Sequence, residues 1–105
     1  MTRYKCAYTT GTDVKQKPCE GLKNARKFAY DKITSGITDY MNIWTDSKSP
    51  YLVGHLVKKR GEVFWVPMNR HKDGSVDEDT VYTTDKYGEV TFYKSRPHRV
   101  DNSPY

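Results

Sequence analysis

The stretch that decides the fold runs from residue 21 to residue 36 and reads GLKNARKFAYDKITSG. When its residues are placed about 100° apart, as in an α-helix, one side of the stretch is apolar. That side is formed by Leu22, Ala25, Phe28, Ala29, Tyr30 and Ile33. The pattern predicts an amphipathic helix over 21–35, and Gly36 is expected to end it in the left-handed conformation. Because small side chains allow close packing, the two alanines indicate that the helix covers a sheet.

Segments typical of β-strands lie on both sides of this helix. In RYKCAYTT (3–10), two tyrosines and Cys6 alternate with other residues, which predicts a strand with one covered face. The following GTDVKQKPCEG (11–21) is polar and contains two glycines and a proline, so a loop is expected there. After the helix, ITDYMNIWT (37–45) is rich in β-forming residues on both faces, which predicts an interior strand.

Two hairpins are expected in the second half of the chain. YLVGHLVKK (51–59) and EVFWVPM (62–68) flank Arg60-Gly61, a pair of residues typical of a hairpin connection. TVYTTDKYGEVTFYK (80–94) has the pattern of a second hairpin, with a glycine near its turn. The polar stretch 69–79 between them is expected to be a loop.

This order of elements predicts an α+β fold with one amphipathic helix packed on an antiparallel sheet of about five strands, in the order β-α-β-β-β-β. A sheet curled toward a small barrel is the alternative, since Gly54 would mark a bulge where the sheet bends. Residues 1–105 are expected to form a single domain, because the chain is long enough for one core only. Residues 95–105 form a basic tail with two prolines, for which an extended conformation is expected.

Several classes of function lack their sequence signals. Cys6 and Cys19 lie thirteen positions apart without a zinc-ligand spacing, so no metal is expected; the thiols are expected to be free, with a disulfide between them as the alternative. The glycines are scattered singly, so no phosphate-binding loop and no cofactor are expected. No apolar run approaches the ~20 residues that cross a bilayer, and the first 20 residues lack a secretory apolar stretch. We therefore expect a cytoplasmic protein without a membrane partner.

The charge distribution is basic but mixed. The chain has 18 basic and 13 acidic residues, a formal net charge of +5. Residues 73–88 run against this balance, because they contain five carboxylates and a single lysine. A surface that tracks nucleic acid does not usually include such an acidic segment, unless the segment points away from the partner.

Basic and aromatic residues nevertheless gather around the expected turn at Arg60. Lys58, Lys59 and Arg70 lie in or near this hairpin beside Phe64 and Trp65. Cations that contact phosphates and rings that stack on bases are the combination used by nucleic-acid-binding modules. In the tail, Arg96, His98 and Arg99 would extend such a patch. The alternative is that the two rings fill the core and that the turn is charged for solubility.

The number of aromatic residues supports a different class of function. The chain has 9 Tyr, 3 Phe and 2 Trp, more than one small core needs, and exposed Tyr and Trp are preferred anchors of protein interfaces. We therefore expect a non-enzymatic protein that occupies the surface of a protein partner, as phage and mobile-element inhibitors do, with nucleic-acid binding as the alternative. The candidate binding residues are Lys58, Lys59, Arg60, Trp65, Arg70, Tyr51, Trp44, Arg96 and Arg99.

A third hypothesis comes from a short resemblance. Thr83-Thr84-Asp85-Lys86-Tyr87, followed by Thr91-Phe92, resembles the terminal strands of barnase-like microbial ribonucleases over about a tenth of the chain. Those enzymes place a histidine as general acid where this chain has Lys86, which departs from their pattern. The resemblance implies RNA cleavage, for which the residues to consider are Glu62, Arg70 and His71.

Overall fold

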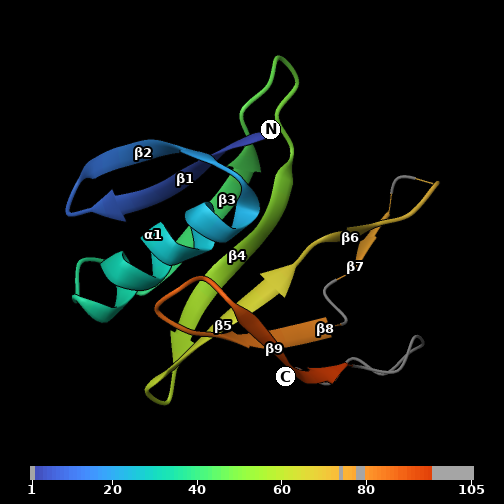
Figure 1. The fold of residues 1–105 in the computed structure, drawn as a ribbon. Helices are drawn as coiled ribbons and strands as arrows, with labels where there is room; N and C mark the ends of the chain where they lie inside the picture. The colour runs from blue at the N-terminus through green and yellow to red at the C-terminus, as the bar shows by residue number, and fades with distance from the viewer. Residues whose placement is uncertain (1, 74, 78–79, 96–105) are drawn as a thin grey trace.

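The computed structural model describes residues 2–73, 75–77 and 80–95. Seven strands form one antiparallel sheet in the order β2-β1-β3-β4-β5-β8-β9, and β6 and β7 form a separate two-stranded ribbon that projects from it (Figure 1). The elements are β1 (Arg3–Thr10), β2 (Asp13–Glu20), α1 (Leu22–Thr34), β3 (Tyr40–Thr45), β4 (Leu52–Lys59), β5 (Glu62–Pro67), β6 (Asn69–Arg70), β7 (Val76–Asp77), β8 (Thr80–Thr84) and β9 (Val90–Ser95). The α+β class is thus confirmed.

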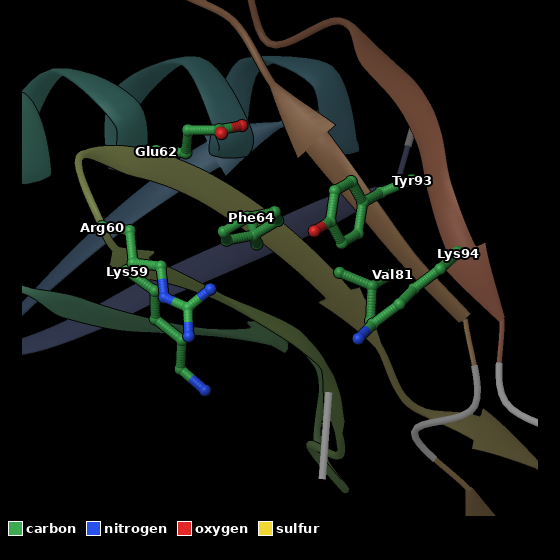
Figure 2. A pocket seen from close by; sticks show the side chains of 7 residues that line it. All are labelled: Lys59, Arg60, Glu62, Phe64, Val81, Tyr93 and Lys94. Atoms are coloured by element: carbon green, nitrogen blue, oxygen red, sulfur yellow. The ribbon is translucent and has the colours of Figure 1, made fainter.

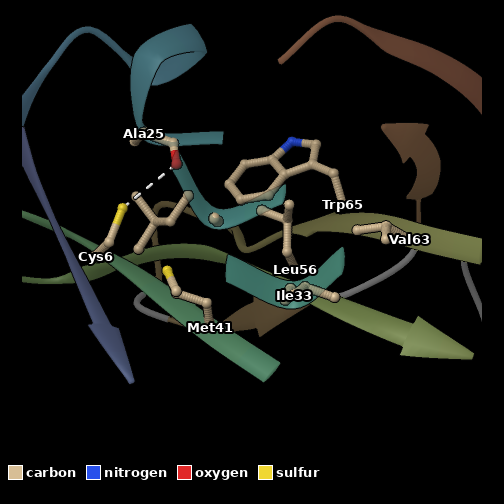
Figure 3. Close-up of a cluster of buried hydrophobic side chains, with 9 residues drawn as sticks. Cys6, Ala25, Ile33, Met41, Leu56, Val63 and Trp65 are labelled. Atoms are coloured by element: carbon tan, nitrogen blue, oxygen red, sulfur yellow. Dashed lines mark hydrogen bonds between the residues drawn. The ribbon is translucent and has the colours of Figure 1, made fainter. Parts of the chain in front are cut away.

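The helix forms where the apolar periodicity predicts it and covers one face of the sheet. Its buried residues are Ala25, Ala29 and Ile33, which belong to the predicted apolar side. They pack on a core whose sheet residues include Cys6, Met41, Ile43, Leu56, Val63 and Trp65 (Figure 3). At 13 residues, α1 falls short of a bilayer's thickness, and the described residues contain no helix that is both long and apolar enough to cross one.

The end of α1 is closed by hydrogen bonds to its last carbonyl groups. The N–H groups of Gly36 and Ile37 donate to the carbonyls of Ile33 and Lys32, at 3.2 and 3.1 Å. This is a Schellman motif, and it requires a residue with positive φ. Gly36 has φ +84°, so the prediction that it ends the helix in the left-handed conformation is confirmed.

The expected loop at 11–21 is a strand, which is one reason why the sheet has seven strands and not about five. β2 pairs with β1 along its whole length, from Thr10 opposite Asp13 to Arg3 opposite Glu20. As an edge strand that is exposed over most of its length, it needs no apolar alternation, and an edge tolerates Pro18, which has no N–H to donate. The sheet also remains open, so the barrel alternative is wrong.

The stretch 69–79 also differs from the expected loop, because it contains the short pair β6 and β7. A register shift in β3 and β4 does lie beside Gly54, where the bulge was expected: Ile43 pairs with Gly54, but Trp44 pairs with Leu52. A Cβ on Gly54 would lie 2.5 Å from the Trp65 ring. This glycine therefore makes room for the indole in the core.

The turn between β8 and β9 is held against the helix by hydrogen bonds. The Asp85 carboxylate accepts hydrogen bonds from the N–H groups of Tyr87 and Glu89, at 2.9 and 3.0 Å. Arg26 donates from Nε to the Gly88 carbonyl at 2.9 Å, and its guanidinium lies 5.5 Å from the centre of the Trp65 ring. Burial lowers the pKa of Arg26, while Glu89 opposes that shift. These contacts join the end of the sheet to α1.

Gly88 and Gly36 form a matched pair for testing this contact. Both have positive φ, +82° and +84°, but a Cβ on Gly88 would lie 2.3 Å from the Lys23 carbonyl oxygen, whereas nothing lies within 4 Å of one on Gly36. We expect Gly36→Ala to lower the free energy of unfolding by about 1 kcal/mol through backbone strain. We expect Gly88→Ala to cost about 2–4 kcal/mol, because steric overlap adds to the strain. Urea denaturation measures both, and equal costs would contradict the close packing of this turn.

The two cysteines are free, and their environments differ. Cys6 is fully buried under α1, where its Sγ lies 3.4 Å from the Ala25 carbonyl oxygen (Figure 3). Cys19 on the edge strand is only half-buried. Burial raises the pKa of the Cys6 thiol above its ordinary value of 9.0, so its reactive thiolate form is disfavoured.

This difference predicts selective alkylation. Iodoacetamide at pH 8 is expected to modify Cys19 in the folded protein and to leave Cys6 unmodified, whereas both react in denaturant. Peptide mass spectrometry distinguishes the two sites. Modification of Cys6 at the rate of Cys19 under native conditions would show that this part of the core opens readily.

Candidate binding site on the helix-free face

The face of the sheet opposite α1, called the helix-free face below, is formed by the alternate side chains of each strand. Lys5 lies opposite Trp44 there, and Asn42 lies opposite His55. His55 is 6% exposed and stacks on Tyr40, with ring centres 4.8 Å apart. His55 is thus buried in the middle of β4, with an aromatic ring over it.

A hollow of about 350 Å³ lies on this face at the end of the β4–β5 hairpin. We call it the hairpin hollow, and it is lined by Lys59, Arg60, Glu62, Phe64, Val81, Tyr93 and Lys94 (Figure 2). Strands β5, β8 and β9 supply its apolar residues, whereas the last residue of β4, Lys59, and the turn residue Arg60 supply two of its cations. Residues more than thirty positions apart in the sequence therefore meet in one site.

A β-bulge in β9 explains how two consecutive residues line the same hollow. Tyr82 pairs with Phe92, but the preceding residue, Val81, pairs with Lys94, which leaves Tyr93 as an extra residue. Regular alternation would point Tyr93 and Lys94 to opposite faces. The bulge turns the strand by one residue, so both side chains reach the helix-free face.

The apolar part of the hollow consists of an aromatic pair beside a buried valine. The rings of Phe64 and Tyr93 meet edge to face, with centres 5.1 Å apart and an interplanar angle of 61° (Figure 2). Val81 is 1% exposed, whereas Tyr93 remains 51% exposed. The Lys94 ammonium lies 5.7 Å from the centre of the Tyr93 ring. The hollow thus offers an apolar contact and an accessible ring next to a cation.

The charged part of the hollow is mostly basic. Lys59, Arg60 and Lys94 carry positive charges, and Glu62 carries the single negative charge among the lining residues. Lys59 and Glu62 are opposite each other at the end of the hairpin, while Arg60 lies at its tip. Concave surfaces with one dominant sign of charge attract ligands of the opposite sign. The hollow therefore favours an anionic group beside an apolar one.

The structure brings only part of the predicted basic patch together. Lys59 and Arg60 line the hairpin hollow. Lys58 instead points to the face that α1 covers, where it pairs with the core residue Val63. Trp65 is 4% exposed and packs in the core, as the alternative interpretation of this ring expects, so it does not lie on the surface beside the cations. The alternation along β5 explains the difference, because it buries Trp65 and presents Phe64 on the helix-free face.

The other predicted aromatic residues lie at the far end of β4. Trp44 is opposite Leu52, about 23 Å from Lys59 at the usual rise of a strand, and it lines a separate hollow with Lys5 and Pro50. Tyr51 is 49% exposed in the turn before β4. The backbone of Arg70 lies in β6, beyond the end of β5. Arg96, His98 and Arg99 lie outside the described residues.

The residues suggested by the ribonuclease resemblance do not converge. Glu62 begins β5, whereas Arg70 and His71 lie beyond its other end, at least about 16 Å along an extended chain. Lys86 is exposed in the β8–β9 turn beside Tyr87. In the part of the chain that the structure describes, no three His, Cys, Asp or Glu side chains group in a way that would hold a metal ion.

The sequence pattern alone does not single out Val81 or Lys94, and Tyr93 is only one of its many tyrosines. The available signal was the run Phe92-Tyr93-Lys94 in a terminal strand, where three large side chains follow one another. The bulge at Tyr93 has no glycine or other residue that marks it in the sequence. The pattern therefore does not reveal that Tyr93 and Lys94 share a face.

No protein-family model matches the chain, and comparison with curated proteins and with solved structures gives no match.

The hairpin tip allows its cation to be removed without loss of the fold. Arg60 and Gly61 have φ +55° and +82°, the combination of a type I′ turn, and Arg60 is the only residue other than glycine with positive φ in the described part of the chain. Arg60→Gly is expected to raise the free energy of unfolding by about 0.5–1 kcal/mol, because relief of strain exceeds the added entropy of the unfolded chain. Gly61→Ala, the control, is expected to lower it by about 1 kcal/mol. Thermal and urea denaturation check both; destabilisation by Arg60→Gly would contradict the strained geometry.

Proposed function

We propose that the chain is a protein-binding domain whose helix-free face holds an acidic segment of its partner, with an apolar or aromatic side chain of that segment in the hairpin hollow. The chain acts by covering this segment of its partner, and it catalyses no reaction. The main support is the hollow itself, where Phe64, Val81 and Tyr93 are bordered by Lys59, Arg60 and Lys94. Interface hot spots are enriched in tyrosine and arginine, both of which line this hollow.

The size of the face fits a protein interface. Specific complexes bury roughly 800 Å² on each partner, more than one hollow supplies. The seven strands of the sheet are together about 29 Å wide at the usual strand spacing, and α1 covers only their other face. Tyr93 in the hollow is 51% exposed, and Tyr40 and Val14, at 42% and 72%, are exposed apolar side chains elsewhere on the helix-free side or its margins.

The distribution of charges favours a protein over nucleic acid. Arg3 and Lys5 both lie within 4 Å of Asp46, and Lys23 forms an ion pair with Glu89. These cations are therefore partly neutralised, and Glu62 places a carboxylate within the hollow itself. A phosphate backbone needs a continuous basic track. A protein segment needs only local complementarity, which the hollow supplies.

Charge reversal in the hollow tests this proposal. We expect Arg60→Glu/Lys94→Glu to weaken binding of the partner by about tenfold or more, because two attractive contacts become repulsive. The control is Lys15→Glu/Lys17→Glu, which changes the net charge equally on the exposed strand β2. The tagged chain and both variants are used to recover partners from extracts of the cells that produce it, with and without nuclease treatment, and the affinity of the recovered partner is then measured by calorimetry.

The pattern of loss decides between the candidate functions. Loss in the hollow variant alone supports a protein partner at this site. Equal loss in both variants would mean that overall charge, and not the hollow, governs binding. Recovery that depends on intact nucleic acid, together with affinity that falls steeply with salt, would transfer the function to nucleic-acid binding.

A further inference from the structure

The two edges of the seven-stranded sheet are protected to very different degrees. Edge strand β2 contains Pro18 and four charged residues among eight, which are features that prevent pairing with another chain. Edge strand β9 reads VTFYKS, with one lysine and no proline. Its Phe92 and Tyr93 are 61% and 51% exposed. An apolar edge without such protection is the kind of surface to which an additional strand pairs.

The hydrogen bonds of the β8–β9 hairpin show which backbone groups of β9 point away from the sheet. The Glu89 carbonyl accepts from the Asp85 N–H at 3.1 Å, and the Thr91 carbonyl accepts from the Thr83 hydroxyl at 3.4 Å. Residues 89 and 91 therefore turn their polar groups toward β8. In an antiparallel pair this direction alternates, so the N–H and C=O groups of Val90 and Phe92 point outward.

We propose that β9 pairs with an extended, acidic segment of the partner, which adds a strand to the sheet. The inference rests on the proposed function, because the edge and the hairpin hollow are continuous: Tyr93 and Lys94 belong to β9 and also line the hollow. Backbone groups of Val90 and Phe92 bind the main chain of the segment. Its alternate side chains reach the hollow, where the excess of positive charge selects carboxylates.

Charge also distinguishes the partner from a second copy of the chain. Two copies joined along β9 would bring together molecules with a net charge of +5 each. An acidic segment instead meets Lys59, Arg60 and Lys94 with complementary charge. The occupant of the edge is therefore a different polypeptide, extended and acidic.

The test begins with a random 12-residue peptide display library selected on the immobilised full-length chain. We expect the enriched peptides to carry carboxylates and an apolar or aromatic residue at alternate positions, because side chains two residues apart share the face that reaches the hollow. One enriched peptide is then synthesised in two forms, N-methylated at odd or at even positions. In a paired strand, the N–H groups of only the odd or only the even residues point toward β9. We therefore expect one methylated form to lose at least about tenfold in affinity, while the affinity of the other stays within about threefold of the unmethylated peptide.

A matched pair of protein variants tests the same contact from the other side. Phe92→Pro removes an N–H group that points outward, so pairing with β8 is kept, whereas Phe92→Ala removes the ring and keeps the N–H. We expect at least a tenfold loss of peptide affinity for the proline variant and a smaller loss for the alanine variant. Circular dichroism and thermal denaturation verify that both variants are folded, and the N-methylated peptides decide the question if the proline variant is not.

The possible results separate this inference from the proposed function. Equal effects of both N-methylated forms, with affinity still lost in Arg60→Glu/Lys94→Glu, would overturn strand pairing and leave the hollow as the binding site. Failure to enrich any peptide, or enriched peptides that bind the charge-reversed variant as well as the wild type, would overturn both. A concentration-dependent dimer that Phe92→Pro abolishes would assign the edge to a second copy and overturn the proposed partner.

Discussion

The rest of the structure depends on the close packing of Ala25 and Ala29 of α1 on the sheet above Cys6 and the residues around it. Two small side chains bring the helix near enough to seal the core with only 13 residues. A helix of this length measures about 20 Å by 10 Å, while the seven strands span about 29 Å. One helix therefore completes a core but leaves the opposite face of the sheet without a covering element among the described residues.

That imbalance gives the aromatic residues two different roles. Trp65 and the half-buried Tyr4, Tyr8 and Phe28 complete the core beneath or beside the helix. On the helix-free face, Tyr40 lies over His55, while Phe64 and Tyr93 form the hairpin hollow. A sheet with a single helix must shield part of its second face with large side chains, and rings of this kind also make good contact surfaces. Residues that build the core and residues that line the helix-free face consequently alternate along the same strands.

The sequence predicts the elements that have strong periodicity and misses those that depend on tertiary context. Helix α1 and the Arg60-Gly61 turn follow from side-chain spacing and turn chemistry, which are local properties. Strand β2 was missed because DVKQKPCE is exposed over most of its length and carries no alternating apolar signal. The sequence predicts only the part of the hollow near the hairpin turn, Lys59, Arg60 and Phe64, because pairing with β8 decides where Tyr93 and Lys94 point. Alternation along the strand predicts that Trp65 and Phe64 lie on opposite faces, but it does not predict which of them lies on the face toward the helix.

The extra residue in β9 also means that the chemistry of the hollow depends on how many residues the strand contains. Tyr93 has no opposite residue in β8, so its removal would leave Lys94 across from Val81 and every later pair in register. A strand shorter by this one position would present a cation without its neighbouring phenol ring. The composition of the hollow is thus adjustable by a change in length at a single point, independently of the residues that hold the fold together.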